Sequence, residues 1–368
     1  MSKSSYFRPI ENSLVYRFHA EQYNHIKERK PKYFAKKNRY NNNNNTVDPN
    51  DPYYVLGLPN EITSLRELIQ FAFNYKGNNV NIQRLIQVIP ILKEIDTMIG
   101  MKELKTGIMD MVMYFVQGMY DTNQDYLHTV VCGPPGTGKT HIARLLAKLY
   151  SGLDILPTDK FEILKRTDLV GKYLGHTAIK TKEALDKCLG GVVFIDEAYS
   201  LAPENSNGNK DSYSKEAIDV LNEYLSNHKN DFVCIIGGYE QELENTIFSI
   251  NKGMKRRFPW KFRIHDYNEQ ELYDMFHLMV ERIGWNIEPN AITIDFFKTH
   301  KNEFSHFGGD IETFITKCKF AHIRRIFGTD NHSKILTTQD IDNAIIVHKQ
   351  HKQTSHIDYT PPPEHMYT

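Results

Sequence analysis

The sequence predicts an α/β fold in which helices cover a parallel sheet, followed by a helical domain. Between residues 127 and 264, strand-like apolar runs alternate with helical patterns. Alternation of this kind is typical of parallel sheets, because each strand needs a crossover to return to the same edge. After Asp266 the apolar spacing becomes helical, and no further strand is expected. We expect strands at 128–132, 161–164, 191–195, 232–236 and 261–264.

Residues 1–50 are predicted to form a disordered, basic and asparagine-rich region. Lysines and arginines cluster between residues 25 and 40, with Tyr33 and Phe34 interleaved, and the run Asn41–Asn45 follows. Such a segment can bind nucleic acid by phosphate neutralisation and aromatic stacking. A solvated basic tail or a localisation signal is the simpler interpretation, because nothing here sets a base-reading geometry.

Residues 51–94 are expected to form a small helical unit. Apolar residues between Ser64 and Lys93 recur at helical spacing, and Asn78-Asn79 separates two helices. A long amphipathic helix is expected to follow, ending near Gln117.

The segment Gly133–Thr140 fits the pattern G-x-x-x-x-G-K-[ST], the phosphate-binding loop or P-loop. A β-branched strand run precedes it and a helical pattern follows it, which is the context that the motif requires. Lys139 is expected to reach the outer phosphates, and the Thr140 hydroxyl to ligate Mg²⁺. The loop backbone is expected to surround the anion, so the predicted nucleotide-binding residues are Gly133, Pro134, Pro135, Gly136, Thr137, Gly138, Lys139 and Thr140.

A second acidic element completes the predicted catalytic site. The apolar run 191–195 ends in Asp196 and Glu197. Ligands of open α/β sheets bind at the carboxyl ends of the strands, where Asp196 can hold Mg²⁺. Glu197 is placed to orient and deprotonate the attacking water. The sequence therefore predicts an enzyme that hydrolyses ATP with Mg²⁺.

These residues resemble AAA+ ATPases, and most closely the CbxX/CfxQ family, whose best-known members are red-type rubisco activases. The resemblance implies an AAA+ nucleotide-binding domain over 95–265 and a helical lid domain over 266–350. The proline-rich tail, 351–368, is expected to be disordered from its composition. It also implies that Ile99 and Gly100 contact the nucleotide. Besides the motifs above, the matching stretches are 168–177, 194–201, 216–218, 237–239 and 251–258.

Two further roles follow from the resemblance. Arg257, with Arg256 as its alternative, matches an arginine finger that reaches the nucleotide of the neighbouring subunit. A finger in trans requires head-to-tail contacts, so a ring is implied, with six subunits usual for the family. Tyr173 matches the aromatic residue of a central pore loop, which grips an extended protein client.

The sequence departs from the family pattern at two positions. Where many AAA+ proteins have a polar asparagine near the γ-phosphate (sensor 1), this chain has Tyr239. The lid segment 307–312 lacks the usual arginine (sensor 2), and Asp310 cannot replace a cation there. Either Arg324 or Arg325 reaches back to the phosphates, or hydrolysis proceeds without that contact.

Composition limits the class of protein. Lys+Arg and Asp+Glu number 45 each, so net charge predicts no polyanionic partner. The four cysteines are widely spaced in apolar runs, and no N-terminal apolar segment or membrane-spanning run appears. We expect a soluble, intracellular (cytoplasmic) protein.

The sequence is compatible with three functions. The leading hypothesis is an oligomeric motor that remodels a protein client of unknown identity. The alternatives are an AAA+ factor acting on nucleic acid through residues 25–40, and a nucleotide-gated assembly scaffold with weak hydrolysis.

Overall fold

The computed structural model describes residues 61–354, except 76, 78, 123, 172, 174, 203–211, 330 and 331. The predicted N-terminal region 1–50, with its basic segment 25–40, lies outside the described residues. The predicted disordered tail 351–368 does so beyond residue 354, whereas residues 351–354 belong to the last helix. Each helix among the described residues is too short or too polar to span a lipid bilayer.

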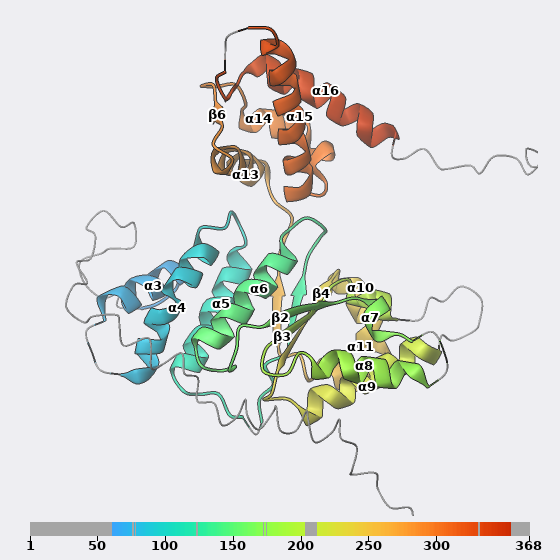
Figure 1. Cartoon of the computed structure of the whole chain (residues 1–368). Coiled ribbons are helices and arrows are strands. Elements are labelled where there is room, and N and C mark those ends of the chain that lie inside the picture. Colours follow the sequence, from blue (N-terminus) through green and yellow to red (C-terminus); the bar gives the residue numbers. More distant parts are fainter. Residues whose placement is uncertain are drawn as a thin grey trace, which may run out of the picture.

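The centre of the molecule is a parallel five-stranded sheet, which confirms the predicted fold class (Figure 1). The strand order is β2-β3-β4-β1-β5. Cys132 pairs with Gly238 and Ile195 with Ile236, so the carboxyl ends of β1, β4 and β3 meet at one edge. The strands are β1 Thr129–Cys132, β2 Phe161–Leu164, β3 Val192–Ile195, β4 Val233–Gly238 and β5 Trp260–Arg263.

Helices cover both faces of the sheet because alternate strand residues point to opposite sides. Val131 and Phe194 face one hydrophobic cluster, whereas Val130 and Val193 face the other. The first face carries α3 Leu65–Asn74, α4 Val80–Asp96, α5 Lys102–Val116 and α6 Lys139–Gly152. The second carries α8 His176–Asp186, α9 Ser212–Asn227, α10 Glu240–Asn245, α11 Ile247–Ile250 and α12 Lys252–Lys255, with the short turns α7 Arg166–Leu169 and η1 Ala198–Leu201.

The helices α3 and α4 belong to the same core as the sheet. Ser64 caps α3 through a reciprocal pair with Glu67, and Asn79 caps α4. Their buried apolar residues form one continuous cluster with α5, α6 and the strands. Within its described residues, the small unit expected over 51–94 therefore has no separate core.

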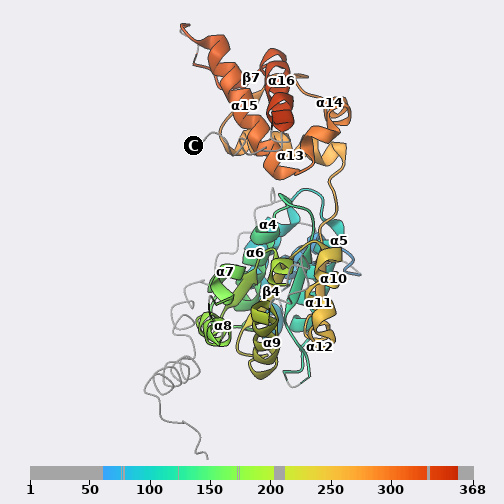
Figure 2. The same cartoon turned by 90° about the vertical axis from the view of Figure 1, so that its right-hand side faces the viewer.

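The chain after β5 forms a helical lid beyond the carboxyl edge of the sheet (Figures 1 and 2). It has its own hydrophobic core, built around Phe276, Phe297 and Phe314. Its helices are α13 Glu269–Arg282, α14 Ile294–Thr299, η2 Lys301–Phe304, α15 Gly308–Ile326 and α16 Thr338–Thr354.

The prediction that strands stop after Asp266 is wrong. The lid contains two short strands, β6 Asn286–Ile287 and β7 Ile335–Leu336, which pair in parallel. Two residues are too short to show the alternation by which a strand is predicted. Backbone hydrogen bonds between segments almost fifty residues apart create this pair, and local sequence does not report them.

Candidate functional site

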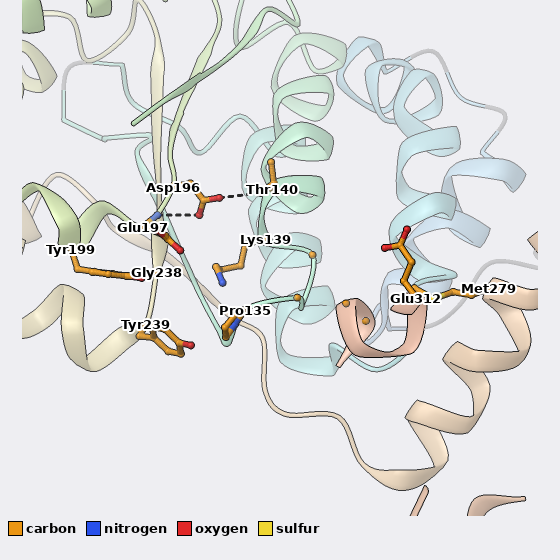
Figure 3. Close-up of a pocket in the computed structure, with 14 residues that line it drawn as sticks. Pro135, Lys139, Thr140, Asp196, Glu197, Tyr199, Gly238, Tyr239, Met279 and Glu312 are labelled. Carbon is orange, nitrogen blue, oxygen red and sulfur yellow. Dashed lines mark hydrogen bonds between the residues drawn. The ribbon is translucent and has the colours of Figure 1, made fainter. Parts of the chain in front are cut away.

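A cavity of about 480 Å³ opens at the carboxyl edge of the sheet, between the P-loop and the lid (Figure 3). A volume of this size suits a nucleotide, since pockets for small ligands occupy about 300–1,000 Å³. The residues that line it are Pro135, Gly136, Gly138, Lys139, Thr140, Asp196, Glu197, Tyr199, Gly238, Tyr239, Met279, Gly308, Gly309 and Glu312.

The tight turns of the P-loop require glycine at two positions. Gly136 has φ +73° and Gly138 has φ +87°, a left-handed region that glycine adopts without steric cost. A Cβ on Gly136 would also overlap the carbonyl oxygen of His306, in the lid. The backbone of the loop therefore packs so close to the lid backbone that residue 136 has no room for a side chain.

Lys139 begins α6 and points into the cavity. Its Nζ donates hydrogen bonds to the carbonyl oxygens of Gly133 (2.9 Å) and Pro134 (2.8 Å), both in the P-loop. Partial burial lowers the pKa of this ammonium, while Asp196 and Glu197 oppose the shift. Among the described residues that line the cavity, Lys139 is the one cationic side chain, so it supplies the positive charge that faces an anion.

Asp196 and Glu197 follow β3 and enter the cavity opposite the P-loop. The Thr140 hydroxyl lies 3.4 Å from Oδ2 of Asp196. Helix α6 and the end of β3 thus bring together two oxygen atoms that can ligate a metal ion. The other oxygen, Oδ1, accepts a hydrogen bond from the Glu197 backbone N–H at 3.0 Å. Glu197 has φ +49°, a conformation that costs a non-glycine residue about 1–2 kcal/mol. This local turn directs its carboxylate into the cavity.

Comparison with known proteins agrees with this geometry. The model of the ATPase family associated with various cellular activities (AAA) matches residues 129–263. A putative cfxQ-like protein of Acanthamoeba polyphaga mimivirus is 35% identical over 83% of this chain and 75% of its own length. A CfxQ homolog of Galdieria sulphuraria is 30% identical over 73% of this chain and 92% of its own length. Stage V sporulation protein K of Bacillus subtilis is 36% identical over 55% of this chain and 63% of its own length.

The chain belongs to the CbxX/CfxQ family of AAA+ ATPases. The match to the AAA model covers the whole five-stranded sheet, from the first residue of β1 to the last residue of β5. The protein is therefore an ATP-hydrolysing enzyme, and the cavity at the P-loop is the candidate for its nucleotide site.

Five of the predicted P-loop residues line the cavity of this AAA+ ATPase, and three do not. Pro135, Gly136, Gly138, Lys139 and Thr140 lie at its wall. Gly133, Pro134 and Thr137 lie behind it and support the loop. The buried Thr137 hydroxyl, for example, donates to the Pro134 carbonyl at 2.8 Å.

Ile99 and Gly100 do not line the cavity. Ile99 packs against the lid core, and Gly100 lies beside Glu271 and Tyr267 at the base of α13. In this structure these two residues join the lid to the AAA+ domain.

Tyr239 stands at the end of β4, in the position that the sequence suggests for sensor 1. Its ring centre lies 6.0 Å from Lys139 Nζ and 6.3 Å from the ring of Tyr199. Burial, followed by the charges of Glu242 and Glu197, raises the pKa of Tyr239, so its phenol remains a hydrogen-bond donor. Tyr199 was not singled out from the sequence. Its place shortly after Asp196-Glu197, in η1, is the signal that could have found it.

The lid supplies Met279 from α13, and Gly308, Gly309 and Glu312 from α15. None of these four was predicted to line the site, because no motif marks them and only the docking of the lid brings them there. The part of the cavity wall that the lid forms thus carries one carboxylate, Glu312, and no arginine among its described residues.

Neither Arg324 nor Arg325 reaches back to the phosphates. Both lie in the last turn of α15, whose first turn is at the cavity. At 1.5 Å per residue, the two ends of this helix are about 25 Å apart. Arg325 is held by Asp340, with Nε 2.8 Å from Oδ1 and Nη2 2.9 Å from Oδ2. The alternative that either arginine reaches the site is therefore wrong.

The predicted finger and pore residues lie away from the cavity of their own chain. Arg257 donates from Nε to Ser226 Oγ (2.6 Å) and from Nη1 to the Gly253 carbonyl (2.6 Å), which fastens it between α9 and α12. Arg256 is exposed beside it. Tyr173 is 67% exposed, and its ring touches His176 edge-on at 5.6 Å.

Proposed function

We propose that this AAA+ ATPase hydrolyses Mg-ATP at a subunit boundary and uses the energy to pull on a protein client. The observation that carries the proposal is the meeting of Lys139, Thr140, Asp196 and Glu197 at one cavity. Phosphoryl transfer to water needs a phosphate cradle, a metal clamp and a base that positions water, and these residues can supply all three.

The oxygen donors near the P-loop fit Mg²⁺. Thr140 and Asp196 offer a hydroxyl and a carboxylate, the oxygen ligands that Mg²⁺ takes alongside water and phosphate. When bound there, Mg²⁺ would neutralise charge on the phosphates.

Glu197 is the proposed general base. Its carboxylate lines the cavity beside Asp196, so it can accept a proton from a water that attacks the γ-phosphate. Lys139 would hold the charge of the outer phosphates during transfer. Tyr239, whose phenol stays protonated, would donate a hydrogen bond near the same end of the nucleotide.

The proposed finger is an arginine supplied by the next subunit. Arg256 and Arg257 are the candidates, and neither lines the cavity of its own chain. Arg256 is exposed, whereas Arg257 already donates two hydrogen bonds within the chain. The contacts therefore favour Arg256 for reaching across a boundary, with Arg257 holding α12 in place. Such an arrangement implies a head-to-tail ring, with six subunits usual for the family.

Tyr173 is the proposed contact with the client. A side chain 67% exposed in a loop bounded by Gly171 and Gly175 contributes little to the core, and its ring can pack against an extended chain of almost any sequence.

A mixing experiment tests the proposal most directly. The double variant Arg256→Ala/Arg257→Ala should bind ATP yet turn it over slowly, and Lys139→Ala should fail to bind. Mixing the two inactive proteins should restore turnover, because some sites then combine an intact Lys139 with intact arginines from a neighbour. If mixtures stay inactive although both variants still assemble, the trans arrangement is wrong.

Glu197→Gln tests the chemical step. It should keep ATP affinity and lose roughly 10²–10⁴-fold in turnover, the usual contribution of a general base. Glu183→Gln is the matched control, since Glu183 is exposed on α8 and does not line the cavity. Equal turnover in both variants would remove Glu197 from the mechanism.

One observation favours a second candidate, a nucleotide-gated scaffold with weak hydrolysis. Along the described wall of the cavity Lys139 is the one cation, and Arg324 and Arg325 lie at the far end of α15. Turnover that rises with protein concentration and again on adding client would exclude the scaffold. Turnover that stays low at every concentration, with tight ATP binding, would support it.

A further inference from the structure

Glu312 places an acceptor on the lid side of the nucleotide cavity. It lies in the second turn of α15 and lines the cavity together with Met279 of α13. The carboxylate is exposed, and it has no hydrogen-bond or ion-pair partner within the part of the chain that the structure describes. An acid in this place is unexpected, because the ligand of the cavity is itself a polyanion.

The cavity has two chemically different sides (Figure 3). Asp196 and Glu197 lie on one side of Lys139, and Glu312 and Met279 lie on the other. Phosphates bound by the P-loop would lie beside Lys139. The γ-phosphate must face Asp196 and Glu197 for water to attack it. The nucleoside of the same molecule then extends toward Glu312 and Met279.

A carboxylate can only accept hydrogen bonds, so it is satisfied by donors and repelled by phosphate oxygens. The neutral donors of ATP are all on the nucleoside, namely the ribose hydroxyls and the exocyclic amine of adenine. We propose that Glu312 determines nucleoside recognition by accepting a hydrogen bond from one of these donors, while Met279 forms the apolar wall beside it. This inference rests on ATP binding in this cavity, as proposed above.

The recognition has a measurable signature. A nucleotide that lacks the recognised donor leaves the Glu312 carboxylate unpaired in the bound state, and hydrogen bonds to charged groups are among the stronger ones. We expect its affinity to fall by about ten-fold or more relative to ADP. Replacing Glu312 by alanine should abolish the difference in affinity between ADP and this analogue, because the side chain that accepts the hydrogen bond is then absent.

The experiment measures binding by calorimetry on the full chain, with ADP so that no hydrolysis occurs. The analogues are 2′-deoxy-ADP, 3′-deoxy-ADP and inosine diphosphate, which lack the two hydroxyls and the amine in turn. Wild type should bind one of the three about ten-fold more weakly than ADP. Glu312→Ala should bind ADP more weakly than wild type does and should no longer distinguish that analogue.

Glu281→Ala is the matched control, since Glu281 is an exposed lid acid on α13 that does not line the cavity. It should behave as wild type. Discrimination that survives in Glu312→Ala would overturn the inference, and so would a wild type that binds all four nucleotides alike. Equal tightening of every nucleotide by Glu312→Ala would show a repulsive charge and no recognition. If wild type binds ADP no better than Lys139→Ala does, the nucleotide site itself is wrong.

Discussion

Replacing Asp340 by asparagine should destabilise the lid, because this carboxylate is held by hydrogen bonds from three neighbouring residues. Its side chain is about 1% exposed. Arg325 donates to both of its oxygens, and Thr337 donates to Oδ2 from its backbone N–H and from its hydroxyl, each at 3.0 Å. His322 Nδ1 lies 3.2 Å from the same Oδ2. Asparagine would turn an amide N–H₂ toward some of these donors.

The size of the effect follows from the pKa of Asp340. Burial raises this pKa, but the hydrogen bonds from Arg325, Thr337 and His322 outweigh it, so the pKa falls from 3.8 to about 2. At 1.36 kcal/mol per pH unit, the charged form contributes about 2–3 kcal/mol to the free energy of unfolding. Because the pKa is lower in the folded state, this contribution is complete above the unfolded pKa of 3.8. It is lost as the pH falls through the folded value.

Urea unfolding followed by Trp285 fluorescence provides the assay. The ring of Trp285 lies 5.2 Å from that of His322, so its emission reports on this cluster. The chain has two tryptophans, and Trp260→Phe leaves Trp285 as the single reporter. Asp340→Asn should lower the free energy of unfolding by at least about 2 kcal/mol at pH 7, and the loss should shrink toward pH 3.

Asp342→Asn is the control, since Asp342 is exposed on the same helix, α16. It should change stability by less than about 0.5 kcal/mol. A similarly small effect of Asp340→Asn at pH 7, or an effect that is equal at pH 7 and pH 3, would refute the reasoning.

Three further predictions concern the P-loop, the pore loop and the sheet. Gly136→Ala should weaken ATP binding by about 5- to 150-fold, the equivalent of about 1–3 kcal/mol of strain, because φ at this residue is +73° and the new Cβ meets the lid backbone. Unchanged affinity by calorimetry would contradict this. Tyr173→Ala should leave the melting temperature and basal turnover unchanged but remove stimulation by a client, and a large loss of stability would show that Tyr173 belongs to the core. Burial lowers the pKa of His128 from 6.5 to about 4, so the folded state binds fewer protons than the unfolded state between these values. Stability should therefore fall as the pH drops from about 6.5 toward 4, and His128→Gln should reduce this slope in unfolding experiments; an identical slope would assign the pH dependence to other groups.

The nucleotide-binding half of the fold was predictable because its signals are local. Each strand is a short run in which β-branched, aromatic or aliphatic residues predominate or alternate with polar ones, and the P-loop motif stands between a strand and a helix in an unbroken stretch. Asp196 and Glu197 could be placed for the same reason, since a strand that ends in acids delivers them to the carboxyl edge of a parallel sheet.

The sequence by itself thus determined the sheet, the phosphate loop and the acids of β3, because residues close together in the chain set these features. Only the tertiary structure decided the opposite wall of the site. It brings Met279 and Glu312 to the P-loop, holds Arg325 on Asp340 and turns Ile99 toward the lid core. Those contacts join segments that are distant in the chain, and they depend on how the lid packs as a body, which no local pattern encodes.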